Sequence, residues 1–150
     1  MNSRNVINLN DLRFSENAYW VLKVAFVFAP ILAGIDKFFN NLTEWTQYLA
    51  PIFPSMFNIT PQTFMEGVGI IEVIAGIGVL LRPRIFSYIV SLWMLGIILN
   101  LLMLGSYYDI ALRDLGLAIG SFALGQLSAL HENQTVRSGK RISRRQTATT

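Results

Sequence analysis

Residues 66–84 read EGVGIIEVIAGIGVLLRPR, and Glu72 lies near the middle of this stretch with apolar residues on both sides. A helix of this composition has no polar face to turn to water, which indicates that it lies in lipid. A charged group at the centre of a bilayer costs about 2.5–3.5 kcal/mol on insertion scales. We therefore expect Glu72 to be protonated, hydrated, or paired with Lys37 or Arg113.

The composition of the whole chain supports a membrane protein of one domain. Hydrophobic residues make up 53% of the 150 residues and charged residues 14%, whereas soluble domains carry roughly 25% charged residues. The mean hydropathy is +0.46.

Four apolar stretches have about the length of a membrane span, which needs roughly 20 helical residues. They cover residues 19–39, 63–81, 85–104 and 112–130, and each is apolar around most of its circumference. The sequence predicts an all-α fold, an integral membrane four-helix bundle over residues 19–130. Residues 1–18 form a polar N-terminal segment, and residues 131–150 form a basic tail that we expect to be disordered.

Positive charges near the span ends predict the orientation, because cytoplasmic loops carry an excess of Lys and Arg. Only Lys37 and Arg113 fall on the side of the first and third loops. Nine others lie in the N-terminal segment, the second loop and the tail: Arg4, Arg13, Arg82, Arg84, Arg137, Lys140, Arg141, Arg144 and Arg145. Lys23 lies one turn inside the first span and can reach that same face. Both termini are therefore expected in the cytoplasm, and the connection between the first two spans on the outer side.

The connection between the first two spans is richer in aromatic residues than a solvent loop. It reads TEWTQYLAPIFPSMFNITPQTF over residues 43–64. We expect it to lie at the membrane interface or to fold back over the helices; an ordinary interfacial aromatic belt is the alternative.

Several classes of function lose support from the composition. The chain has no cysteine, which excludes disulfides, thiolate metal sites and thiol catalysis by this chain. The net charge of +3 comes from the tail, so no basic face for nucleic acid is expected. His131 is the single histidine and lies at the inner end of the fourth span, which does not favour haem, and no spacing indicates a metal site.

Polar residues gather in the outer half of the predicted bundle, while the inner half is almost bare. The group consists of Asp36, Lys37, Glu66, Glu72, Asn100, Asp109, Arg113 and Asp114. Intramembrane ionisable residues are functional candidates by default. The alternative for Glu72 is a buried ion pair that fixes the helix register.

Helical spacing predicts which of these side chains point inward, since small residues mark close helix contacts. In the second span Gly69, Glu72 and Gly76 share a face, and in the third span Trp93, Gly96 and Asn100 do. In the fourth span one face carries Asp109, Arg113, Gly116, Gly120 and Ala123, and the adjacent strip carries Asp114, Ala118, Ser121 and Gly125. Because of the Gly116–Gly120 pair, we expect Arg113 as well as Glu72 to point into the bundle.

The candidate site is this outer polar core, with Asp36, Lys37, Glu72, Asn100, Arg113 and Asp114 as its members. Its carboxylates could carry protons for quinone or ion chemistry. A quinone head group would suit a polar pocket there, with Lys37, Asn100 and Arg113 donating hydrogen bonds to its carbonyl groups.

Three stretches resemble the DoxX family of small four-helix membrane proteins. They are GIDKFF at residues 34–39, GIIEVIAGIGVLL at 69–81 and LRDLGLAIGSFAL at 112–124. The resemblance implies a bacterial inner-membrane protein, and it carries over Lys37, Glu72, Arg113 and Asp114 as the polar core. One branch, DoxD, is the membrane subunit of a thiosulfate:quinone oxidoreductase, and other members serve in redox-stress complexes.

Three functions remain open from the sequence. The first is a quinone-linked redox membrane subunit, which would need a partner subunit for sulfur chemistry because the chain lacks cysteine. The second is a non-catalytic membrane anchor or assembly partner. The third is a small proton- or solute-coupled transporter, for which four spans without repeat symmetry would require a homo-oligomer.

Overall fold

The computed structural model describes the backbone of residues 9–147 and the side chains of residues 13–132. This part of the chain is helical, without a strand. The elements are α1 (Leu9–Asp36), the short 3-10 helix η1 (Trp45–Tyr48), α2 (Ile52–Phe57), α3 (Pro61–Leu81), α4 (Pro83–Leu104) and α5 (Tyr108–Thr147).

Four of these helices are long and apolar enough to cross a membrane. The spans are Arg13–Asp36, Pro61–Leu81, Pro83–Leu104 and Tyr108–Glu132. The predicted all-α fold with four membrane helices is therefore confirmed.

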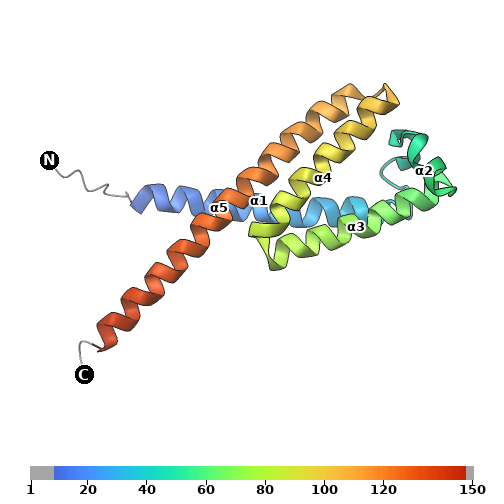
Figure 1. The fold of residues 1–150 in the computed structure, drawn as a ribbon. Helices are drawn as coiled ribbons and strands as arrows, with labels where there is room; N and C mark the ends of the chain where they lie inside the picture. Colours follow the sequence, from blue (N-terminus) through green and yellow to red (C-terminus); the bar gives the residue numbers. More distant parts are fainter. Residues whose placement is uncertain (1–8, 148–150) are drawn as a thin grey trace.

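The four long helices form two antiparallel pairs that cross each other. α1 packs along α3, and α4 packs along α5, with α5 also contacting α1 (Figure 1). We call the end of the bundle that carries residues 37–60 and the α4–α5 turn the loop end. The opposite end, which holds the α3–α4 turn and the start of α1, is the terminal end.

Local sequence signals explain where the helices begin and end. Thr60 caps α3, because its hydroxyl oxygen accepts a hydrogen bond from the Thr63 N–H at 3.1 Å, and Pro61 occupies the first helical position. Gly105 ends α4 with a φ of 73°, a left-handed conformation that glycine adopts without steric cost. Pro83 starts α4 directly after Arg82, so that the α3–α4 turn is very short.

Close backbone contact between α1 and α3 depends on glycines. A Cβ added at Gly69 would lie 2.5 Å from the backbone oxygen of Gly34, and one at Gly76 would lie 2.8 Å from the backbone oxygen of Val27. Gly69, Glu72 and Gly76 are all buried, so the predicted inward face of this helix is confirmed.

Apolar packing fills the rest of the interior toward the terminal end. The core cluster consists of Tyr19, Phe26, Val27, Ala75, Val79, Val90 and Leu124. Many other large apolar side chains are exposed on the outside of the bundle, as expected for helices that face lipid.

The structure differs from the sequence prediction in the C-terminal tail. α5 continues as helix to Thr147, where disorder was expected from residue 131. At the other end, α1 starts at Leu9, within the polar N-terminal segment. Extending a formed helix needs no new nucleus, and no proline interrupts residues 131–147, so the backbone continues past the span. The side chains of the tail cations lie outside the described residues.

Candidate functional site

The Glu72 carboxylate is paired with Lys37. The Lys37 ammonium donates to Glu72 Oε2 at 2.5 Å, and the two side chains are only 3% and 7% exposed. The Trp45 ring covers the same ammonium, with its centroid 3.7 Å from Lys37 Nζ. Lys37 reaches this position because α1 ends at Asp36, opposite the face of α3 that holds Glu72.

Asp36 holds the segment that follows α1. Its carboxylate accepts hydrogen bonds from the Trp45 indole N–H at 2.8 Å, the Asn41 N–H at 3.1 Å and the Leu42 N–H at 3.1 Å. One buried carboxylate thus fixes the turn after α1 and also places the Trp45 ring over Lys37.

Asn100 fastens the same segment to α4. Its amide nitrogen donates to the Tyr48 carbonyl oxygen at 2.6 Å, and its amide oxygen accepts from the Ala50 N–H at 2.9 Å. The Asn100 amide therefore supplies hydrogen bonds to two backbone groups that have no partner within a helix.

Gln62 is a member of this network that the sequence reasoning missed. Its amide nitrogen donates to the Lys37 carbonyl oxygen at 3.0 Å and to Glu66 at 3.1 Å, and its amide oxygen accepts from Asn40 at 3.2 Å. A polar residue in the first turn of a membrane helix, beside Glu66, is the signal that could have indicated it.

Residues 37–60, which we call the cap, are therefore folded back over the loop end of the bundle (Figure 1). This agrees with one of the two arrangements that the aromatic sequence indicated. Tyr107 in the α4–α5 turn completes the contact, because its hydroxyl donates to Gln47 at 3.1 Å and its ring packs against Tyr48.

The prediction for the fourth span was wrong about the inward face. Arg113 is 67% exposed and donates through its Nε to Asp114 at 3.3 Å, whereas the Asp114 side chain is 7% exposed. A Cβ at Gly116 would meet nothing within 4 Å, so this glycine marks no helix contact. The buried strip of α5 is the adjacent one: Ala111, Asp114, Ala118, Ser121, Leu124, Gly125 and Ser128.

Packing selects this strip because its small and hydroxyl side chains fit closely against α4. The Ser121 hydroxyl donates to the Ser87 carbonyl oxygen at 2.6 Å. A Cβ atom added at Gly125 would lie 2.7 Å from the Tyr88 ring. The strip through Arg113 lies about 100° around the helix; its residues Asp109, Arg113 and Gly116 are exposed, and only its later part, at Gly120, lies against Phe26 of α1.

Three buried carboxylates, those of Asp36, Glu72 and Asp114, lie at the loop end together with the buried ammonium of Lys37. Glu72 interacts electrostatically with both Lys37 and Asp114, and Asp114 interacts with Lys37. The Trp93 indole N–H lies close to the Glu72 carboxylate. Its nitrogen is buried, but it forms no hydrogen bond of good geometry. Glu72 is thus paired with Lys37, whereas Asp114 is paired with the exposed Arg113, and the Trp93 N–H is a buried donor beside them.

The six candidate residues therefore have unequal positions. Asp36, Lys37, Glu72 and Asn100 belong to one network of the cap and the bundle, and Asp114 lies buried beside it. Arg113 is outside. Among the residues whose side chains are described, no group of His, Asp and Glu is arranged to hold a metal ion.

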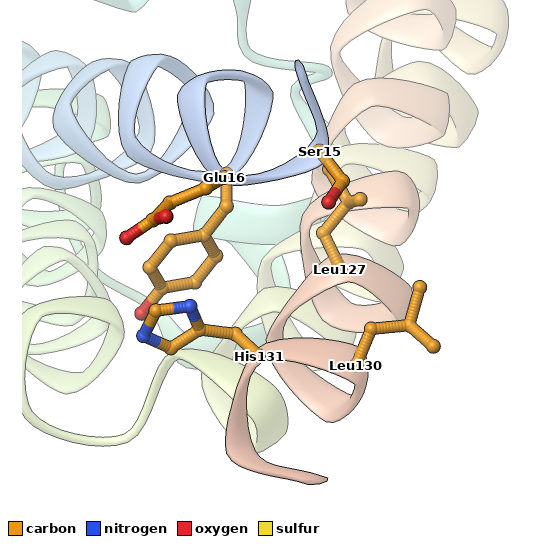
Figure 2. A pocket seen from close by; sticks show the side chains of 6 residues that line it. Ser15, Glu16, Leu127, Leu130 and His131 are labelled. Atoms are coloured by element: carbon orange, nitrogen blue, oxygen red, sulfur yellow. The ribbon is translucent and has the colours of Figure 1, made fainter. Parts of the chain in front are cut away.

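A small hollow lies at the terminal end of the bundle, between α1 and α5 (Figure 2). Its lining consists of Ser15, Glu16, Tyr19, Leu127, Leu130 and His131. The sequence reasoning considered His131 only as evidence against haem, and it did not connect this residue with α1.

Comparison of the chain with models of known protein families, with curated proteins and with solved structures finds no match. The assignment as an integral membrane protein depends on the four apolar helices themselves.

Proposed function

We propose that the chain is a DoxX-like protein of the bacterial cytoplasmic membrane that serves as a non-catalytic subunit, around which a redox partner assembles. One observation carries this proposal: the polar residues at the loop end are used to hold the cap in a fixed position. Asp36, Lys37 and Asn100 each bond to the cap or to the helix beneath it.

The cap presents apolar side chains on its outside. Phe39, Leu42, Met56 and Phe57 are 67%, 73%, 70% and 64% exposed. Exposed apolar groups that are held rigidly beside a membrane suit docking, because little conformational entropy is lost when a partner binds. This supports the cap as the surface that a partner subunit contacts.

The resemblance of three stretches to the DoxX family supports a redox partner. The composition agrees with redox chemistry in that partner and not in this chain. Without cysteine the chain offers no thiol for sulfur chemistry. Electron transfer would then occur in the partner subunit, with this chain holding that subunit at the membrane.

The test is native mass spectrometry of complexes extracted in mild detergent from the protein's own membrane. We expect a stoichiometric redox partner on the wild type and its loss in Asn100→Leu, which removes both bonds to the cap. Met103→Leu is the matched control, since Met103 lies one turn away on α4 and is 57% exposed. Retention of the partner by Asn100→Leu would show that the cap is not the docking surface.

A quinone-linked role is the second candidate, and the buried Asp114 carboxylate near Glu72, together with the unpaired Trp93 N–H, favours it. The donors expected from the sequence fit a quinone poorly: Lys37 bonds Glu72, both polar atoms of Asn100 bond the cap, and Arg113 is exposed. Glu72, Asp114 and Trp93 are the groups that could hold a proton or donate to a carbonyl group there.

A bound quinone would supply the uptake of two electrons and two protons, with the electrons coming from the partner subunit. The same mass spectra test this candidate, because a bound mass equal to a quinone should disappear in Trp93→Phe, which keeps an aromatic ring but no N–H. Proteoliposome flux that is lost in Glu72→Gln would instead indicate the proton- or solute-coupled transporter.

A further inference from the structure

One uncharged polar side chain of α5 is exposed to lipid inside the membrane span. Gln126 lies six residues before Glu132, where the span ends, which places it about 9 Å inside the span along the helix axis. It is exposed, and it makes no hydrogen bond with any residue that the structure describes. Its amide, with two N–H donors and a carbonyl acceptor, therefore meets hydrocarbon, which can bond neither.

The nearer membrane surface does not relieve this amide. A side chain on a helix leans toward the N-terminus of that helix, and the N-terminus of α5 lies at the loop end. The lean therefore carries the Gln126 amide deeper into the bilayer, away from the terminal end that is closer to it. Satisfying the amide requires a polar group at the same depth on the outside of the protein.

Gln126 belongs to an exposed strip with the spacing of a helix–helix contact. The strip, which we call the α5 seam, repeats at alternating intervals of four and three residues and consists of Leu112, Gly116, Ile119, Ala123, Gln126 and Leu130. These residues are exposed, apart from the half-buried Ala123. A mean spacing of 3.5 residues is that of helices packed in a left-handed coil. The seam rises about 27 Å along the helix, close to the thickness of a bilayer core.

The α5 seam lies on the far side of α5 from the buried strip. At 100° per residue, it is centred about 160° around the helix from Asp114, Ser121 and Gly125. A Cβ added at Gly116 would meet nothing within 4 Å, so this glycine is free of contacts within the chain and open to another molecule. Gly116 and Ala123 place a small residue in each turn of the seam's seven-residue repeat, which lets a second helix approach closely.

We propose that the α5 seam binds the same seam of a second copy of this chain, with the two Gln126 amides bonded to each other. Two copies inserted in the same direction are related by a two-fold axis along the membrane normal, so identical residues meet at the same depth. Each amide then donates an N–H to the carbonyl oxygen of the other, because an amide holds both a donor and an acceptor. A second copy thus brings a polar group to the required depth, which a lipid chain does not. This inference does not depend on the proposed function, which concerns the cap.

The first test uses single cysteines, because the chain contains none of its own. The full-length protein in its own membrane is treated with copper phenanthroline, which oxidises two facing thiols to a disulfide. Ile119→Cys, on the seam and 63% exposed, should give a cross-linked homodimer. Leu117→Cys is the matched control, since Leu117 is 40% exposed on the same helix but about 160° around it from Ile119, and it should stay monomeric.

The second test measures the dissociation constant of the dimer by energy transfer between labelled copies that are diluted in mild detergent. Gln126→Leu should weaken the dimer about tenfold, the effect of one interhelical hydrogen-bonded pair. Gly116→Leu should abolish the dimer by keeping the helices apart. Gly96→Leu fills an equally open position on α4 and should leave the dissociation constant unchanged. Circular dichroism confirms that each variant keeps its helices.

Several results would overturn the proposal. In the cross-linking test they are a monomeric Ile119→Cys, equal cross-linking of Leu117→Cys, and a product that contains another protein in place of a second copy. In the dilution test they are an unchanged dissociation constant in Gln126→Leu or Gly116→Leu, and an equal loss in Gly96→Leu.

Discussion

Replacing Lys37 by methionine would leave the Glu72 carboxylate buried without its cation. The ammonium and the carboxylate are 2.5 Å apart, both side chains are more than nine-tenths buried, and the Trp45 ring lies 3.7 Å from the ammonium. Removing one partner of a buried pair costs about 3–5 kcal/mol, because the remaining charge loses its compensation. We expect this loss for Lys37→Met and a similar one for Glu72→Leu.

The double variant Lys37→Met/Glu72→Leu distinguishes pairing from mere size. With neither charge buried, its free energy of unfolding should lie within about 1 kcal/mol of the wild type, since apolar replacements of a buried ion pair are often neutral or stabilising. Glu72→Gln should lose less than Glu72→Leu, because the amide oxygen still accepts from Lys37 and Asp114 remains nearby.

Equilibrium unfolding in mixed micelles of mild detergent and SDS, followed by circular dichroism, gives the free energies for this cycle. The coupling energy between the two sites should amount to several kcal/mol. Additive losses in the double variant would refute the reasoning, as would single variants within 1 kcal/mol of the wild type. Either result would mean that the pair does not hold the cap against the bundle.

Three other perturbations test the packing, the cap and the surface. Gly69→Ala should cost about 1–3 kcal/mol in the same unfolding assay, since its Cβ would collide with the backbone of Gly34, while Gly116→Ala, which meets nothing within 4 Å, should be neutral or slightly stabilising. Asn100→Leu should leave the helical content unchanged but expose residues 37–60 to limited proteolysis, and an unchanged cleavage rate would contradict its role in fastening the cap. Arg84→Gln breaks an exposed ion pair and should change the unfolding free energy by less than about 1 kcal/mol; a larger loss would show that the pair is more than a surface contact.

The sequence alone determined the membrane character and the number of long helices. These follow from span length and from apolar residues around the whole circumference, which are local properties of the chain. It also predicted that Glu72 is protonated, hydrated or paired with Lys37 or Arg113, because a buried charge without compensation is costly wherever the helix packs.

The tertiary structure decided which cation that partner is and which strip of α5 faces inward. Arg113 and Asp114 are adjacent in sequence and lie about 100° apart on the helix, so spacing left two strips, and the glycines favoured the wrong one. Close packing against α4 through Ser121 and Gly125 chose the strip with Asp114. Lys37 became the partner because α1 ends at Asp36 and the cap folds back over it. That contact joins residues 35 positions apart, a separation that no local pattern reports.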